Sequence, residues 1–157
     1  AKRDEIEQKI AEKHAAIAEK LSGKRAEVCE KKQSAINRIL DNRVSAAERH
    51  LNTFNSIRDR LVAFVANKQL SVENASALEV IMTDKQAAAQ AAIEAAQAAD
   101  FTCGDADATE PGRIVIDQLS AQKQALKDYR TAIKNYAVAV KSAATTKPAD
   151  STEGGVQ

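Results

Sequence analysis

The segment Asp105-Ala-Asp107-Ala-Thr109 is the first place where residue types and spacing suggest chemistry. One large class of phosphohydrolases with an aspartate nucleophile uses an Asp-x-Asp-x-Thr string. That chemistry needs the string at the end of a buried parallel strand, whereas an alanine-rich helical pattern precedes it here. The aspartates also begin like a calcium loop, but Glu110 stands where glycine is required and Ile116 where the closing glutamate is required. We interpret the segment as a solvated acidic loop at the start of a helix.

The other reactive residue types lack catalytic partners in the sequence. His14 and His50 are 36 residues apart on one predicted helix, so they cannot share a site within one subunit. No histidine cluster has metal-ligand spacing, no glycine-rich phosphate loop occurs, and serines and cysteines lack a nearby base. We therefore predict a protein that is not an enzyme and needs no metal or cofactor, and we interpret His14 as a polar residue within an apolar stripe.

The first half of the chain predicts one very long helix. From Ile6 to Val65 apolar residues recur at helical spacing without a proline, and Gly23 is the single strong helix-weakening residue, so we expect a continuous or gently bent helix. Between Val28 and Val44 the favoured steps are all four, so the stripe drifts around the helix. The second half carries a seam with steps of four and three: Leu40, Val44, Ala47, Leu51, Phe54, Arg58, Leu61 and Val65.

Two further helices are predicted. The second runs from Val72 to about Ala99 with Ser71 as its N-cap, and the third from about Glu110 to Ala144 with Pro111 in its first turn. Residues 100–112 read as a loop, and residues 145–157 have the composition of a linker or tail. The third helix carries a seam that matches the first in length and period: Val115, Leu119, Gln122, Leu126, Tyr129, Ile133, Tyr136 and Val140.

Polar residues interrupt both seams. Arg58 and Gln122 each stand at a seam position, where they either meet polar partners that specify the register of the helices or lie at a wet edge. Tyr129 and Tyr136 are one heptad apart, which is typical of core residues with hydrated hydroxyls.

These patterns predict an all-α fold: an elongated antiparallel three-helix bundle whose very long N-terminal helix projects as an arm. We expect the arm at residues 1–35, the bundle at 36–144 and a flexible tail at 145–157.

Cys29 and Cys103 are the two cysteines of the chain. If the second helix folds back about a turn near Leu70, Ala99 falls beside roughly Asp41. Cys29 lies about 18 Å further along the first helix, and the extended residues after Ala99 cover roughly 13 Å, so within the uncertainty of the helix ends the two cysteines can meet. A disulfide would close a loop of more than seventy residues and indicate an oxidising compartment. The alternative is two unrelated free cysteines.

Two cysteine-containing stretches carry a resemblance to a known group of proteins. They are Arg25-Ala-Glu-Val-Cys-Glu-Lys-Lys on the long helix and Thr102-Cys103-Gly104 in the loop before the last helix. With this layout the chain resembles small exported long-helix proteins of candidate-phyla bacteria, over most of its length from about Ile6 to Ala144. The resemblance implies export and this helical architecture, and it implies no activity.

Composition and charge exclude several functional classes. The 157 residues include 29% charged residues with a net charge of +1, which argues against binding nucleic acid through counterion release. No stretch approaches the roughly 20 apolar residues that span a bilayer. The chain begins at Ala1 with charged helical sequence, as an exported protein would after removal of a signal peptide, although a start chosen by cloning would look the same. We expect a periplasmic, cell-surface or extracellular location.

The arm carries apolar residues that a single helix cannot bury: Ile6, Ile10, Ile17, Leu21 and Val28. Our leading hypothesis is a homo-oligomer, in which a structural protein self-associates through the arm into a dimer, filament or surface assembly. The alternative is a monomeric periplasmic or surface binding module or chaperone that grips polypeptide or cell-wall partners.

Overall fold

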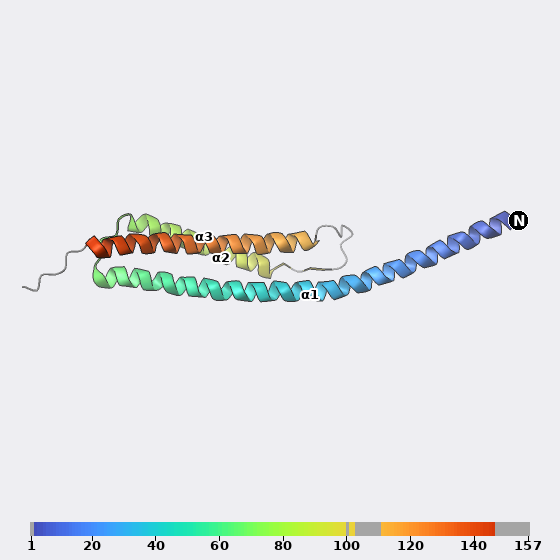
Figure 1. The fold of residues 1–157 in the computed structure, drawn as a ribbon, viewed down its shortest axis with the longest axis horizontal. Helices are drawn as coiled ribbons and strands as arrows, with labels where there is room; N and C mark the ends of the chain where they lie inside the picture. Colours follow the sequence, from blue (N-terminus) through green and yellow to red (C-terminus); the bar gives the residue numbers. More distant parts are fainter. Residues whose placement is uncertain (1, 100, 103–110, 147–157) are drawn as a thin grey trace, which may run out of the picture.

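The computed structural model describes residues 2–99, 101–102 and 111–146, with side chains described for 8–99, 101–102 and 113–146. Three helices make up nearly all of this: α1 (Lys2–Lys68), α2 (Ala75–Gln97) and α3 (Pro111–Thr146). They pack side by side into an elongated bundle, and the N-terminal part of α1 extends well beyond it (Figure 1). The predicted all-α three-helix bundle with a long N-terminal helix is confirmed.

Helix α1 is unbroken from Lys2 to Lys68 and curves gently (Figure 1). Its 67 residues give a rod of about 100 Å at the helical rise. Gly23 lies inside this helix, and a Cβ atom built there would meet nothing within 4 Å. A glycine in a helix interior costs roughly 1 kcal/mol relative to alanine, which is too little to interrupt a helix whose neighbouring residues favour it.

The turn after α1 has the geometry of a Schellman motif. Gln69 adopts a left-handed φ of 48°, the Leu70 amide donates to the Val65 carbonyl at 3.1 Å, and the Gln69 amide donates to the Ala66 carbonyl at 3.2 Å. These two bonds satisfy carbonyls that the end of α1 would otherwise leave open. The chain therefore leaves the axis of α1 at Gln69 and Leu70.

The predicted start of α2 at Val72, with Ser71 as its cap, is wrong. The helix begins at Ala75, and its N-cap is Asn74, which has a left-handed φ of 56° and makes no side-chain cap hydrogen bond. Residues directly after a Schellman turn cannot all be helical, because the chain must first complete its reversal. Asn tolerates the left-handed region better than most residues, so the helix starts after Asn74 rather than after Ser71.

The core is formed by the two predicted seams and one face of α2. Every residue of both seams is buried or half-buried, and helix α2 packs most extensively against α3. The buried residues of α2 are Met82, Ala89, Ile93 and Ala96. Two alanines in this set allow close approach of the helices, while the fully buried Tyr129 and Tyr136 supply the bulk that the alanines lack.

Helix α3 begins at Pro111, one residue after the predicted start, and runs two residues past the predicted end. The hydroxyls of Thr145 and Thr146 donate to the Ser142 carbonyl within this last turn. Of the predicted tail, residues 147–157 lie outside the described residues.

Candidate assembly interface

The arm of α1 is exposed on all sides. Every residue from Gln8 to Val28 is exposed, and the first half-buried residue is Cys29. Four of the predicted interface residues keep about half of their surface in water: Ile10 (49%), Ile17 (56%), Leu21 (50%) and Val28 (52%). The side chain of the fifth, Ile6, lies outside the described residues. The structure therefore gives the described members of this apolar stripe no cover from the rest of the chain.

Two polar residues complete the stripe at steps of four and three. His14 follows Ile10, and Lys24 precedes Val28, so the order along the helix is apolar, polar, apolar, apolar, polar, apolar. This order reads the same in both directions. We call the six residues the arm stripe: Ile10, His14, Ile17, Leu21, Lys24 and Val28.

The arm stripe points away from the bundle. At about 100° per residue, its centre lies about 130° around α1 from the seam that begins with Leu40 and Val44. That seam faces α2 and α3, because its residues are buried in the common core. The drift expected between Val28 and Val44 thus turns the exposed apolar surface away from α2 and α3.

The crossover from α2 to α3 is tied to α1 by one side chain. Asn37 donates from Nδ2 to the Phe101 carbonyl at 3.2 Å and accepts from the Phe101 amide at 3.0 Å. The Asn37 side chain thus pairs with both backbone groups of Phe101, as a neighbouring backbone would. This pair of bonds holds residue 101 about eight residues from Cys29 along α1, a connection that the sequence pattern did not predict.

Cys29 lies at the junction of arm and bundle. It is half-buried and has an interaction partner in the chain. Its predicted partner, Cys103, lies outside the described residues, so the disulfide stays a prediction. The Asn37 to Phe101 contact brings the backbone to within two residues of Cys103 and thereby supports the pairing.

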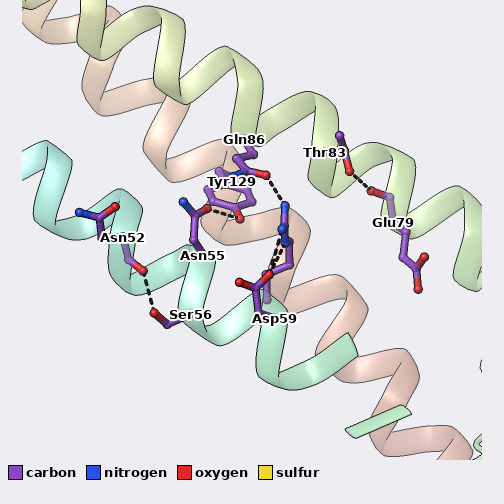
Figure 2. A network of polar contacts seen from close by, with 9 residues as sticks. Asn52, Asn55, Ser56, Asp59, Glu79, Thr83, Gln86 and Tyr129 are labelled. Atoms are coloured by element: carbon purple, nitrogen blue, oxygen red, sulfur yellow. Dashed lines mark hydrogen bonds and ion pairs between the residues drawn. The ribbon is translucent and has the colours of Figure 1, made fainter. Parts of the chain in front are cut away.

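Arg58 interrupts the seam of α1 and contacts polar partners there, which was one of the two alternatives predicted for it. Its guanidinium donates to Gln86 Oε1 of α2 and, at 2.9 Å, to its neighbour Asp59 (Figure 2). Close by, the Tyr129 hydroxyl of α3 donates to Asn55 Oδ1 of α1 at 2.8 Å (Figure 2). All three helices thus share polar contacts at one level, which favours a role in fixing their register.

The two core tyrosines have hydrogen-bonded hydroxyls. Tyr136 donates to Glu79 Oε1 at 3.0 Å, and burial, the hydrogen bond to Glu79 and the charge of that carboxylate together raise the pKa of Tyr136 to about 12. Burial likewise raises the pKa of Tyr129, against a lowering by Arg58. Both tyrosines are fully buried, so they are core residues and not a ligand platform.

The described residues contain no grouping of three or more His, Cys, Asp and Glu side chains able to hold a metal ion. His14 and His50 are both exposed on α1, far apart along the rod. The acidic string Asp105, Asp107 and Thr109 falls outside the part of the chain that the structure describes. Within that part, no helix has the length and apolar character needed to cross a membrane.

Comparisons of the chain with protein-family models, with curated proteins and with solved structures gave no match.

Proposed function

We propose that this protein is a non-enzymatic, exported structural protein that self-associates through its N-terminal arm. The observation that carries the proposal is the arm stripe, whose four apolar side chains stand about half exposed on a stretch of helix that no other described part of the chain covers. An isolated helix gains most of its stability in proteins from packing an apolar face. A second copy of the chain supplies such a face.

The symmetry of the arm stripe favours an antiparallel pair of arms. With a two-fold axis between Ile17 and Leu21, Ile10 faces Val28 of the second copy, and Ile17 faces Leu21. The two polar positions, His14 and Lys24, then face each other. A parallel pair in register would instead place Lys24 opposite Lys24, which is unfavourable.

Two of the three charge contacts on one flank of the stripe agree with this arrangement, and the third, Lys20 beside Lys20 of the other copy at the two-fold axis, opposes it. Lys13 and Glu27 occupy equivalent positions on the same flank of the stripe, seven residues on either side of Lys20. In the antiparallel pair each Lys13 lies beside Glu27 of the other copy. Glu27 is exposed and already bridges to Lys31 at 2.8 Å within its own helix, so it lies where a second cation can approach.

The expected association is reversible. Eight half-exposed apolar side chains would be covered, each contributing on the order of 1 kcal/mol, and association itself costs several kcal/mol. The dimer should therefore form with a dissociation constant in roughly the micromolar to millimolar range. Larger assemblies require a further contact between dimers.

A pair of double variants tests the role of the arm. Ile10→Asp with Ile17→Asp places charge in the stripe, and Ala15→Asp with Ala26→Asp places the same charge on the opposite side of the same helix. Sedimentation equilibrium over a range of concentrations should show dimers for the native chain and the second variant, and monomers for the first. A native chain that stays monomeric throughout, or equal behaviour of the two variants, contradicts the proposal and favours a monomeric binding module.

Charge reversal tests the antiparallel orientation. Lys13→Glu alone creates two Glu-Glu contacts across the proposed interface while leaving the bridge from Glu27 to Lys31 intact. Because exposed pairs contribute about 0.5 kcal/mol each, two lost pairs should weaken the dimer by about fivefold. Adding Glu27→Lys should restore association, and no restoration would contradict the antiparallel arrangement.

We propose in addition that Cys29 and Cys103 form a disulfide, as export would allow. Cys29 lies eight residues before Asn37, which is about 12 Å along the helix. Cys103 lies two residues after Phe101, so the extended chain covers about 7 Å, and a disulfide spans the remaining distance. In the chain-entropy view the bridge contributes about 4 kcal/mol. Intact mass should rise by two hydrogens per chain on reduction, and an unchanged mass would exclude the bridge.

A further inference from the structure

A groove of about 590 Å³ runs between α1 and α3 in the bundle. No residue of α2 lines it, so it lies on the outer side of the contact between α1 and α3. Its apolar lining comes from Ala46, Ala47 and Phe54 of α1 and from Leu119 and Leu126 of α3. The volume falls within the range of small-molecule binding sites.

The rim of the groove is strongly basic. Arg43 of α1 and Lys123, Lys127 and Arg130 of α3 line it, and no acidic residue does. None of these four cations makes an ion pair with another residue of the described chain, whereas other charges nearby in sequence do, such as Arg58 with Asp59. This local surplus contrasts with the net charge of +1 for the whole chain.

Gln122 supplies an independent indication of a ligand. Its side chain lines the groove and is 3% exposed, and its Nε2 has no hydrogen-bond acceptor among the described residues. A buried amide without a partner is costly, on the order of 1 to 3 kcal/mol. A ligand oxygen in the groove would supply the missing acceptor once the Gln122 side chain turns Nε2 toward the groove, because this atom is covered in the structure.

The register of the two helices places Gln122 beside the smallest residues of the groove. The Phe54 and Tyr129 rings are in contact with centroids 6.1 Å apart. α1 and α3 run in the same direction (Figure 1). Seven residues earlier on each helix, Ala47 therefore lies level with Gln122, where a small side chain leaves room for a headgroup.

We propose that the groove binds a small anionic amphiphile, with a carboxylate or phosphate head and an unbranched apolar body. The head accepts hydrogen bonds from Gln122 and is neutralised by Arg43 and Lys123. The body lies along Leu126 and Phe54 toward the Arg130 end. From Arg43 to Phe54 this path extends about 16 Å along the helix.

The apolar lining and the basic rim act on different parts of such a ligand. An inorganic anion would gain the cations but cover no apolar surface, and a neutral alcohol would cover apolar surface but leave the cations and the Gln122 amide without an anion. Only a molecule with an anionic head and an apolar body satisfies the cations and the Gln122 amide and also covers the apolar lining. This inference concerns the bundle and is independent of the arm and of self-association.

Titration calorimetry with the full chain tests the proposal, with decanoate and decyl phosphate as probes below their micelle concentrations. Inorganic phosphate and acetate serve as head-only controls, and 1-decanol serves as the neutral control. We expect decanoate or decyl phosphate to bind at one site per chain, at least tenfold more tightly than any control. Tighter binding of decyl phosphate than of decanoate would identify a phosphate head, and the reverse a carboxylate.

Charge variants locate the site. Arg43→Gln with Lys123→Gln should weaken binding about tenfold or more, as the loss of charge-assisted contacts predicts. Lys134→Gln with Lys141→Gln removes the same charge from exposed positions of α3 outside the groove and should change binding less than twofold. Circular dichroism melts without ligand confirm that both variants fold. Absence of binding to the native chain, equal binding of 1-decanol, or equal effects of the two double variants overturns the proposal.

Discussion

At the scale of single residues, two glutamines in the bundle have opposite surroundings. Gln86 accepts a hydrogen bond from Arg58, while the buried Nε2 of Gln122 has no acceptor among the described residues. Replacing Gln122 by Leu should stabilise the fold by about 1 to 3 kcal/mol, because an unpaired buried amide is removed. Replacing Gln86 by Leu should destabilise it by about 2 kcal/mol, because Arg58 loses a partner.

Urea denaturation of both variants measures these differences. At this chain length each kcal/mol also corresponds to a shift of about 2 to 4 °C in the melting temperature. A destabilised Gln122→Leu variant would show that the native amide has a partner after all.

The buried tyrosines predict a loss of stability at alkaline pH. The folded pKa of Tyr136 is about 12, above the ordinary value of 10.0, so the unfolded chain releases this proton first as pH rises. The contribution of Tyr136 to the free energy of unfolding is complete below about pH 10 and is lost progressively up to about pH 12. Denaturation midpoints should therefore fall across this window. In Tyr136→Phe the fall should be smaller, and an equal fall in that variant would assign the effect to other groups.

At the scale of elements, the end of α1 is stabilised by backbone bonds but carries a strained residue. Gln69 adopts a left-handed conformation that costs a non-glycine residue about 1 kcal/mol. Gln69→Gly should raise the free energy of unfolding by roughly that amount, since the Schellman bonds are kept. Gln90→Gly, within α2, should lower it by about 1 kcal/mol. Chemical denaturation compares the two, and a loss in Gln69→Gly would mean that its side chain makes contacts worth more than the strain.

The helices and their buried faces followed from periodicity in the sequence. Steps of four and three from Leu40 to Val65, and from Val115 to Val140, suffice to specify the core because each seam is long and regular. The start of α2 did not follow, since Ser71 and Asn74 are equally good caps by residue type. Its position is set by how the chain leaves α1 at Gln69 and Leu70, which depends on backbone conformation rather than on cap preference.

At the scale of the whole molecule, features that depend on how helices lie side by side were beyond sequence reasoning. The sequence marked Gln122 as an interruption, but only the relative position of α1 and α3 shows that Arg43, Lys123 and Lys127 surround it. The contact between Asn37 and Phe101 joins residues 64 positions apart and has no pattern that would identify it. The exposed apolar arm, by contrast, was predictable from the sequence. Its apolar residues lie on a helix much longer than the two helices that could cover them.

Because α1 is continuous, its length sets the distance between the two bundles of the proposed dimer. If two arms pair about the level of Glu19, the first buried residue of each bundle, Leu40, lies about 30 Å away, so the two bundles stand about 60 Å apart. Seven residues inserted after Val28 should add about 10 Å per arm and turn the arm stripe by only about 20°. Five inserted residues should turn it by about 140°.

Small-angle X-ray scattering distinguishes these cases through the maximum dimension of the dimer. The seven-residue insertion should lengthen the particle by about 20 Å while leaving its pairing intact. The five-residue insertion should lengthen the particle by about 15 Å. It should also change the scattering profile, because the bundles then lie in a different relative orientation. A particle of unchanged length in both cases would mean that the spacing is set elsewhere in the chain.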